Sequence, residues 1–447
     1  MKTSQDQYVE SVPLAVEGAY DQAALIIEAA KEEQYKEKDR VLYFLDLGML
    51  YHWSEEYELS NQMLSSAESA IEELFTKSVS KALTSGVLND NALDYSGEDY
   101  EDIYLNVFKA LNYIALDDEE SALVEIRRVQ IKLNLLEDKY KELIDEYNAS
   151  EYAEGTLEPR ENRFHNAVLA RYLSLLLYRS QGEVDDARID RESMEEAWQS
   201  QAQIYNFPKP EFPLEEAPDD KALVNVLTFT GLCPVKLADT LYLTTGPGVV
   251  YIAMTGQSED YVTDMVGFNV LAMPGIEGGI HFKIQFPRLT ERGSDVTHAV
   301  VKFDGNIVAE TAMIESIEGI ARETFLLKQP LIVGKTIIRA AAKNIAKEIG
   351  KDKMQDNLSD QGTGGLILGI LAGVAADVAV DVTENADLRI SQFFPARAGI
   401  VEIETEPGTY DVTVEYMNGN GIVSVMKHGP MEFSAGELNL VESFILR

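Results

Sequence analysis

The feature of this sequence that most limits its fold is a proline-rich stretch near the middle of the 447-residue chain. Its prolines fall within eleven residues, at Pro208, Pro210, Pro213 and Pro218. Proline lacks the backbone N–H that helices and central strands use, so neither element is expected to run through this stretch. The pattern of apolar residues also differs between the two sides of this stretch. We therefore expect an α+β multidomain fold, divided into residues 1–206, a linker at 207–219, and residues 220–447.

The first domain is predicted to be all-α. From Tyr8 to about Tyr205, apolar residues recur at intervals of three and four, and glycine and proline are scarce. This is the pattern of amphipathic helices that each bury one face.

A turn followed by a small residue occurs four times in this helical domain. The four stretches are 18–23, 55–60, 117–122 and 182–187, and their last residues are Ala23, Ser60, Ala122 and Ala187. In tetratricopeptide repeats, a small residue early in the second helix lets the two helices of a hairpin pack closely. The separations are 37, 62 and 65 residues, against an ideal period of about 34. The pattern predicts a degenerate tetratricopeptide-like array with extra helices or loops, and an irregular helical bundle is the alternative.

The charge of the chain is strongly acidic and unevenly distributed. There are 38 basic and 76 acidic residues, a net charge of −38. Residues 1–220 hold 20 basic and 48 acidic residues, a charge of −28, which leaves −10 for the remainder. Such a field repels phosphate backbones and favours cations or basic partners. We therefore expect no nucleic-acid binding.

Acidic segments mark two expected helix starts in the first domain. Residues 98–102 begin with Glu98 and Asp99, and a second acidic segment covers 117–120. Neither has the glycine and the ligand spacing of a calcium loop. Acidic side chains are favoured at a helix N-terminus by the helix dipole. We expect both segments to be solvated helix starts.

A charged group follows on the next expected helix and is a candidate interaction site. It consists of Glu125, Arg127 and Arg128. These side chains either form an internal ion-pair network or line a concave groove of the helical array.

The second domain is predicted to be β-rich. Alternating or apolar runs bounded by glycine and proline indicate strands, at 222–230, 249–254, 281–286, 296–303, 307–309, 400–405, 410–416, 421–426 and 440–446. Helices are expected near 312–323, 331–350 and 364–384. A sandwich-like β domain with the last two helices packed on it as a hairpin accounts for this order.

The helix expected at 331–350 carries a basic stripe. Lys335, Arg339 and Lys343 are four residues apart, which places them along one side of a helix. The stripe is either a docking surface, for anionic lipid head groups or for the acidic first domain, or an ordinary solvated face.

The helix expected at 364–384 is apolar and has glycines at Gly365, Gly369 and Gly373. That spacing permits close helix contact, as in membrane helices. The uninterrupted apolar run ends at Asp377, short of the about 20 residues that span a bilayer. We expect a buried helix, with Asp387 and Arg389 locking the hairpin onto the C-terminal strands.

Recognisable reaction chemistry is missing from the sequence. Cys233 is the only cysteine, which rules out an intrachain disulfide or a cysteine cluster from one chain. The histidines lack the spacing of metal ligands. The glycine-rich stretches lack the sequence motifs of phosphate-binding or dinucleotide-binding loops. No catalytic residue, metal ligand or cofactor is predicted.

Several short motifs resemble a family of uncharacterised bacterial proteins. They are 94–101, 105–106, 110–113, 125–128, Lys335-Thr336, Arg339-Ala340, Ala386-Asp387-Leu388-Arg389, Pro395 and 407–410. Members of this family combine a tetratricopeptide-like N-terminal half with a characteristic C-terminal half, and are often lipoproteins. They commonly have a tryptophan shortly after the signature arginine, where this chain has Ser391.

The resemblance implies residence in the bacterial cell envelope, periplasmic or lipid-anchored in the full precursor. No leader is recognised at the N-terminus of this sequence, so a cytoplasmic location is the alternative. We expect a non-enzymatic scaffold or protein-binding protein whose partner is recruited by the helical repeats, with peripheral membrane association as a further possibility. The alternative is a small-ligand receptor or an enzyme with a site near the domain junction.

Overall fold

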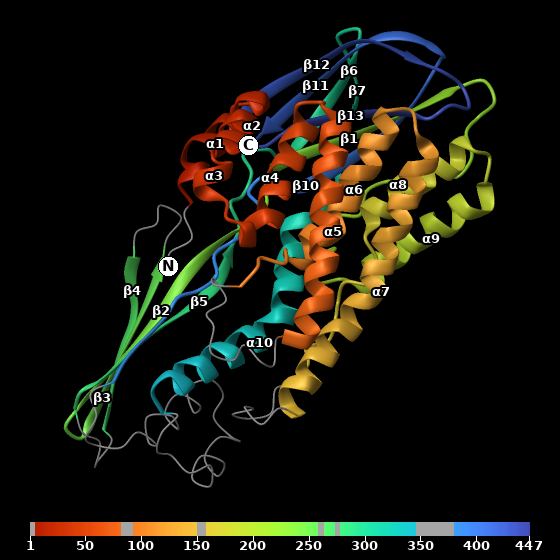
Figure 1. Ribbon diagram of the computed structural model, residues 1–447. Coiled ribbons are helices and arrows are strands. Elements are labelled where there is room, and N and C mark those ends of the chain that lie inside the picture. Colours follow the sequence, from red (N-terminus) through yellow and green to blue (C-terminus); the bar gives the residue numbers. More distant parts are fainter. Residues whose placement is uncertain (1–4, 82–92, 150–157, 258–262, 273–277, 346–379) are drawn as a thin grey trace.

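The computed structural model describes residues 5–81, 93–149, 158–257, 263–272, 278–345 and 380–447. Helices make up the N-terminal half of the chain and β-sheets dominate the C-terminal half (Figure 1). The predicted change from helices to strands is confirmed.

The helices of the first half mostly follow one another as antiparallel pairs. They are α1 (Asp6–Val16), α2 (Tyr20–Ala29), α3 (Lys31–Gln34), the 3₁₀ helix η1 (Glu37–Asp39), α4 (Arg40–Trp53), α5 (Tyr57–Lys81), α6 (Asp99–Ala115), α7 (Glu119–Ala149), α8 (Val168–Ser180) and α9 (Val184–Ser200). Their packing places the apolar residues of the three- and four-residue spacing in the interior.

The turns of four helix pairs share one backbone arrangement. Each has a residue with positive φ, at Gly18, Glu55, Asp117 and Gly182. The residue that follows donates its N–H to a carbonyl five positions earlier, as Glu56 does to Tyr51 at 2.9 Å and Asp118 to Tyr113 at 2.8 Å. This is the hydrogen bond of the Schellman motif, which ends a helix and reverses the chain.

The small residue after each turn lies between the two helices of its pair. Ala23, Ser60, Ala122 and Ala187 are all 0% exposed. In the α4–α5 pair, the Ser60 hydroxyl donates to the carbonyl of Gly48 at 2.7 Å. The short side chains are therefore what allows the helices to approach closely.

The strands form three sheets in the described residues. They are β1 (Ala222–Leu232), β2 (Val235–Gly246), β3 (Val249–Gln257), β4 (Thr263–Ala272), β5 (Ile280–Thr290), β6 (His298–Phe303), β7 (Asn306–Glu310), β8 (Ala312–Ser316), β9 (Val380–Glu384), β10 (Pro395–Thr405), β11 (Gly408–Asn418), β12 (Gly421–Phe433) and β13 (Asn439–Ile445). The central sheet has the order β13-β1-β10-β8, the outer sheet β12-β11-β6-β7, and the arm sheet β4-β3-β2-β5-β9.

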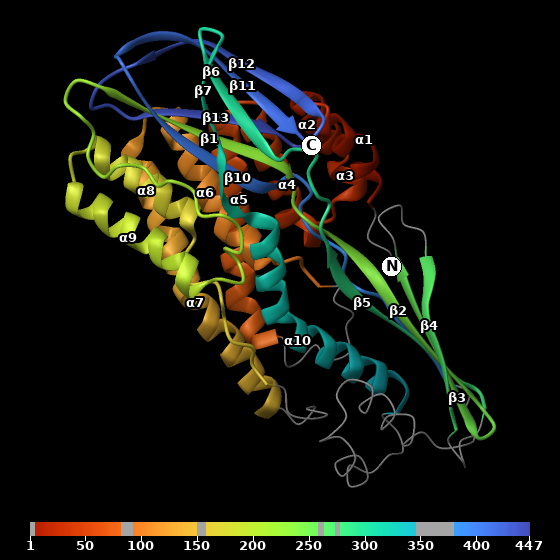
Figure 2. The same ribbon diagram turned by 180° about the vertical axis from the view of Figure 1, so that it is seen from behind.

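The central sheet lies between the helices and the outer sheet. Along β1, Val224 and Val226 join a core cluster with residues of the outer sheet. Leu227 and Phe229 join a second cluster with the helices. Both faces of β1 are thus covered, which explains its nearly continuous apolar sequence. The arm sheet extends away from this body on the opposite side from α8 and α9 (Figures 1 and 2).

The helical half and the C-terminal half therefore share one hydrophobic core, although the predicted linker separates them in the sequence. The ring of Trp53 on α4 lies 4.8 Å from that of Phe444 on β13, and Phe108 on α6 lies 5.2 Å from Phe229. Residues 207–219 contain no helix or strand, and Phe212 packs against Trp198 of α9. The stretch marks the change of secondary structure, while the two halves share a core.

Two predicted helices of the second half need correction. Residues 312–316 are strand β8, so the helix expected near 312–323 begins at Ile317. Helix α10 (Ile317–Ile345) then runs through Pro330 and includes most of the helix expected at 331–350. The burial of Leu327 and Leu331 at 5% and 4% exposure shows why packing keeps it helical despite the missing donor.

The helix expected at 364–384 falls mainly outside the described residues. Its last part, Val380–Glu384, is strand β9, which pairs in parallel with β5. The valines and the threonine of this stretch suit a strand better than a helix. The prediction that these five residues belong to a helical hairpin is therefore wrong.

Gly48 gives a direct test of the close packing between α4 and α5. A Cβ at Gly48 would lie 2.6 Å from Leu64 Cδ2 and 3.3 Å from the Leu64 backbone nitrogen. Alanine in a helix is otherwise favoured over glycine by up to about 1 kcal/mol, but overpacking costs about 1–3 kcal/mol. We expect Gly48→Ala to lower the free energy of unfolding by about 1–2 kcal/mol in urea denaturation.

The control is Gly419→Ala, because a Cβ there meets no atom within 4 Å. Its free energy of unfolding should change little. Equal or greater stability of Gly48→Ala would show that α4 and α5 are not packed this closely.

Candidate functional site

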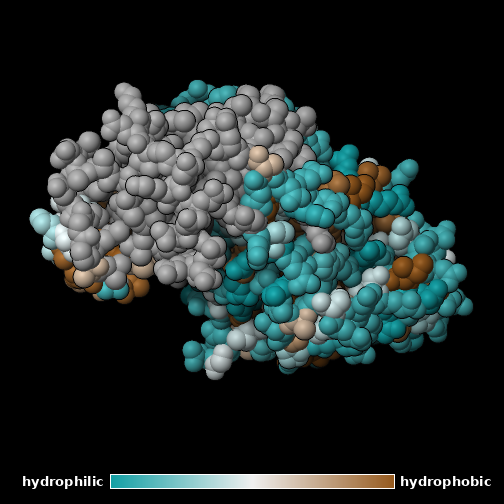
Figure 3. All heavy atoms as spheres, turned by 90° about the horizontal axis from the view of Figure 1, so that it is seen from below, coloured by the Kyte–Doolittle hydropathy of each residue, from teal (hydrophilic) through white to brown (hydrophobic). Residues whose placement is uncertain are grey.

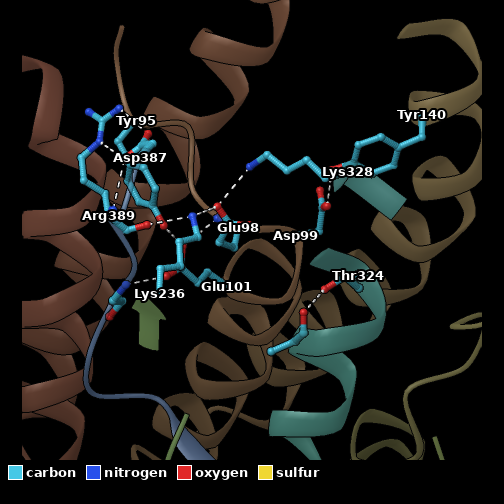
Figure 4. Close-up of polar contacts among 12 residues, drawn as sticks. Tyr95, Glu98, Asp99, Glu101, Tyr140, Lys236, Thr324, Lys328, Asp387 and Arg389 are labelled. Carbon is cyan, nitrogen blue, oxygen red and sulfur yellow. Dashed lines mark hydrogen bonds and ion pairs between the residues drawn. The ribbon is translucent and has the colours of Figure 1, made fainter. Parts of the chain in front are cut away.

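Charged side chains gather where the start of α6 meets α10, β2 and the segment before β10 (Figure 4). We call this group the junction cluster, and it comprises Asp39, Glu98, Asp99, Glu101, Lys139, Lys236, Lys328, Asp387 and Arg389. Residues 385–394, which precede β10, are called the connecting segment.

The first turn of α6 organises the carboxylates of the junction cluster. Glu98 is the N-cap, and its backbone N–H donates to Glu101 Oε2 at 2.7 Å in a capping box. The Tyr95 hydroxyl donates to the same oxygen at 2.7 Å. The other oxygen, Glu101 Oε1, accepts the Ser391 N–H at 2.6 Å. One carboxylate thus joins the start of a helix to the connecting segment.

Arg389 connects the connecting segment to the helical half. Its guanidinium forms a two-pronged pair with Asp387, at 2.9 Å from Nε and 2.7 Å from Nη2. Its Nη1 donates to Asp39 at 2.9 Å and to the Leu93 carbonyl at 3.0 Å, and the guanidinium lies 5.3 Å from the Tyr95 ring centre. Such a fork suits the planar shape of arginine and not that of lysine.

Two lysines approach Glu98 from the C-terminal half. Lys236 of β2 lies 2.5 Å and Lys328 of α10 lies 3.0 Å from Glu98 Oε1. Lys236 also donates to the Arg389 carbonyl at 2.9 Å. Glu98 therefore ties together β2, α10 and the connecting segment.

Asp99 holds the adjacent helix α7. It accepts from Lys139 at 2.6 Å and from the Tyr140 hydroxyl. Burial acts to raise the pKa of Asp99, but the charges of Lys139 and Lys328 outweigh it and leave the pKa lowered. The carboxylate therefore stays ionised.

Burial and ion pairing act against each other throughout the junction cluster. Burial alone would raise the pKa of Asp387, yet the hydrogen bonds and charge of Arg389 lower it to about 2. The pKa of Glu98 is likewise lowered, because Lys236 and Lys328 overcome its burial. The charged partners thus compensate one another for their lost hydration.

Glu101 behaves differently from its neighbours. Its side chain is 0% exposed, and burial followed by the charge of Glu98 raises its pKa to about 7. With Glu101 protonated, the junction cluster contains four acidic and four basic charges. A neutral Glu101 therefore balances the charge of the cluster.

Two more buried carboxylates hold the C-terminal half to the helices. Asp46 of α4 accepts from the Ser391 hydroxyl at 2.8 Å and the Gln392 N–H at 3.2 Å, and its pKa is raised to about 6 by burial. Glu315 of β8 accepts from Tyr104 at 2.5 Å and from the Leu169 N–H at 2.7 Å, and burial raises its pKa to about 7.

The structure brings together four of the predicted site residues, Glu98, Asp99, Asp387 and Arg389. The prediction that segment 98–102 is solvated is wrong at its start: Glu98, Asp99 and Glu101 are 4%, 7% and 0% exposed. The helix start was correctly placed, but lysines from distant elements cover it. Arg389 also reaches Asp39 and Leu93 of the helical half, so it does not act only on the C-terminal strands as expected.

A second ion cluster contains Glu125 and Arg128. Glu125 and Glu68 both pair with the buried Lys109, at 3.0 and 2.8 Å, and Arg128 pairs with each of them. The pKa of Glu68 falls to about 2, because Lys132 and Lys109 outweigh its burial. This is the internal ion-pair network among the predicted alternatives. Arg127 lies apart and is exposed, with Nη2 at 3.5 Å from the Tyr178 hydroxyl.

Lys335, Arg339 and Lys343 all lie on α10. Their side chains fall outside the described part of the structure, so the basic stripe stays a prediction.

Sequence reasoning missed Glu101, Lys236 and Lys328. Lys236 sits in the apolar run Val235-Lys236-Leu237-Ala238, and a lone charge in such a strand is a sign of a buried ion pair. Glu101 follows the N-cap by three residues, which is the capping-box spacing. Lys328 carries no signal that distinguishes it from a surface lysine.

No family model, curated protein or solved structure matches this chain. Among the described residues, no helix combines the length and the apolar character that crossing a bilayer requires, and no group of three metal-ligating side chains is found there.

The junction cluster is arranged to hold elements together. Glu98, Glu101, Lys236 and Arg389 are each at most 4% exposed, and each has its partner inside the protein. The geometry fixes the connecting segment against α6, α10 and β2.

Removing Arg389 tests the central ion pair. Arg389→Met leaves Asp387 and Asp39 buried without their cation, and breaking such a pair costs about 3–5 kcal/mol. We expect a loss of that size in the free energy of unfolding. The control is Arg447→Met, because the Arg447–Asp295 pair has side chains 52% and 60% exposed and should be worth at most about 1 kcal/mol. Equal effects of the two substitutions would contradict the central role of Arg389.

Glu101 predicts a pH dependence of stability. A carboxyl whose pKa rises on folding contributes stability that is fully present below the unfolded pKa and lost as the pH rises through the folded pKa. For Glu101 that loss takes place as the pH rises from the unfolded pKa of about 4.3 to the folded pKa of about 7. Between pH 5 and pH 8, we expect the free energy of unfolding to fall by roughly 1–3 kcal/mol more in the natural protein than in Glu101→Gln.

Denaturant titrations at a series of pH values measure this difference. Glu142→Gln, on the exposed face of α7, serves as the control and should follow the natural protein. Parallel curves for the natural protein and Glu101→Gln would show that Glu101 does not titrate in this range.

Proposed function

We propose that this chain is a non-enzymatic scaffold of the bacterial envelope that binds a protein partner through its helical half. The observation that carries the proposal is an exposed apolar stripe on α7. Val124, Ile131 and Leu135 lie at helical spacing and are 43%, 57% and 58% exposed. On a strongly acidic protein, such a stripe is the feature that suits contact with another polypeptide.

The inner face of the helical half is already occupied by the chain itself. The connecting segment lies against this face, with Trp53 Nε1 donating to the Phe393 carbonyl at 2.9 Å and Asp46 accepting from Ser391 and Gln392. This leaves the outer surface, where α7 lies, for a partner. The contact also supports the idea that the helical half is suited to holding polypeptide.

We propose that the helical half is a degenerate tetratricopeptide-like array. The shared turn geometry of four helix pairs, and the buried small residue after each turn, support this assignment. The apolar cluster between the central and outer sheets supports a sandwich-like arrangement in the second half.

The envelope location rests on the sequence resemblance, which implies a periplasmic or lipid-anchored protein. Peripheral membrane association through the basic stripe of α10 belongs to the same proposal. Neither depends on the α7 stripe.

A small-ligand receptor is the second candidate. A hollow of about 420 Å³ lies between the turns at 18–22 and 53–55, where the buried Ser54 hydroxyl has no hydrogen-bond partner among the described residues. The hollow lies near the end of α4, where the helices meet the C-terminal half. A small polar molecule would suit its lining.

The partner-binding proposal is tested by introducing negative charge into the stripe. Ile131→Glu/Leu135→Glu places two carboxylates in the proposed contact, and loss of central interface residues costs about 2 kcal/mol or more. Affinity capture from cross-linked native envelopes should recover a reproducible partner with the natural protein. Its yield should fall at least about tenfold with the double variant.

The matched control is Gln199→Glu/Ser200→Glu, which adds the same charge at exposed positions of α9. It should capture the partner normally. Equal capture by both variants, or no reproducible partner for the natural protein, would contradict the proposal.

A further inference from the structure

The arm sheet exposes apolar side chains on one face. Tyr242, Ala253 and Phe268 form one row across β2, β3 and β4, and Tyr251 pairs with Val270 in the next row. Tyr242, Phe268, Tyr251 and Val270 are 38%, 61%, 41% and 47% exposed. In Figure 3, brown apolar residues gather at the left end of the view, where the arm sheet lies. We call this the open face.

The other face of the arm sheet is largely buried, apart from Met254 at 48% exposure. Leu243, Phe282 and Ile284 alternate with open-face residues and are 2%, 4% and 2% exposed. An antiparallel sheet with one face on a core ordinarily has polar residues on the other. The apolar residues of the open face are therefore a surface that needs a partner.

Strand β4 is also an edge strand. In the described residues it pairs with β3 on one side only. Its sequence from Met265 to Ala272 contains no charged residue and no proline, two of the means by which natural edges avoid pairing. Its pairing with β3 shifts register at Val266. One side of β4 thus offers a row of backbone donors and acceptors to another strand.

The open edge decides which class of partner fits. Immersion in lipid would leave the unpaired backbone groups of β4 without hydrogen bonds, and open sheet edges do not occur in the hydrocarbon region. A strand of polypeptide satisfies these groups and covers the adjacent side chains.

Charge permits that strand to come from a second copy. The whole chain has a net charge of −38, so contact between two helical halves is disfavoured. The strands of the arm sheet are nearly neutral, with Lys236, Lys283 and Arg288 against Asp239, Asp264, Asp381 and Glu384. Two arms can therefore meet without the repulsion that acts between the acidic bodies.

The sequence of β4 is also suited to pairing with itself. Around Phe268 it reads Val266-Gly267-Phe268-Asn269-Val270, with a valine two positions away on each side. An antiparallel pair centred on Phe268 places the two phenylalanines opposite each other. It also places each Val266 opposite Val270 of the second copy, and aromatic and β-branched cross-strand pairs are favourable.

We propose that this protein forms a two-fold symmetric dimer in which the β4 edges of two copies pair antiparallel about Phe268. The two arm sheets then become one continuous sheet, and the rows from Tyr242 to Phe268 meet at the dimer axis. A two-fold contact of this kind uses the same surface in both copies.

Two double variants, both substituted at positions 266 and 270, test the register of the proposed β4–β4 pairing. Val266→Lys/Val270→Lys sets lysine opposite lysine at both pairs, whereas Val266→Lys/Val270→Glu sets lysine opposite glutamate at both. Sedimentation velocity of the purified chain over a series of micromolar concentrations gives the dimer dissociation constant. We expect the lysine–lysine variant to dimerise at least about tenfold more weakly than the lysine–glutamate variant.

Circular dichroism and thermal unfolding show whether each variant is folded. The proposal is overturned if the natural protein is a monomer throughout this range, or if the two folded variants dissociate equally. Binding of a monomeric natural protein to phosphatidylcholine vesicles would overturn it in favour of a lipid contact.

Discussion

The fork between Arg389, Asp387 and Asp39 is the interaction on which the rest of the structure depends. It fixes the connecting segment at the point where the helical half meets the sheets. A buried guanidinium is costly unless every donor finds an acceptor in good geometry. Because these hydrogen bonds need defined distances and angles, the fork fixes the position of the connecting segment more precisely than apolar contacts alone would. The neighbouring contacts of Ser391 and Phe393 then follow from the chain geometry.

The protein separates two uses of charge. Its acidic body carries a large excess of carboxylates, which disfavours contact between the helical halves of two copies. Its interior uses carboxylates in near balance with lysine and arginine, as around Glu98 and Glu68. Asp46 and Glu315 are held mainly by hydroxyl and backbone donors. Their raised pKa values reflect that difference in partners.

Sequence reasoning predicts the parts of this fold that depend on local pattern. The helical half, the four turns and most strands follow from periodicity and turn residues, because each is determined by neighbours along the chain. Strand β8 was missed because five residues beside a helix carry too little pattern. The signature residues Asp387 and Arg389 were found, as were Glu98 and Asp99. These residues come together through Lys236 and Lys328, which are distant in the sequence. Contacts of this kind cannot be predicted from the spacing of neighbouring residues.

The pairing of β1 with strands far along the chain has a consequence for the order in which the protein can form. β1 pairs with β10 and β13, so the central sheet is incomplete until residues up to Ile445 are available. For the same reason, the contacts of His52 with Glu442 and of Trp53 with Phe444 cannot form until β13 has been synthesised. During synthesis, the helical half therefore emerges with its inner apolar face uncovered. Its folding is coupled to the arrival of the distant strands, which makes the nascent chain a natural client for chaperones that shield apolar surface.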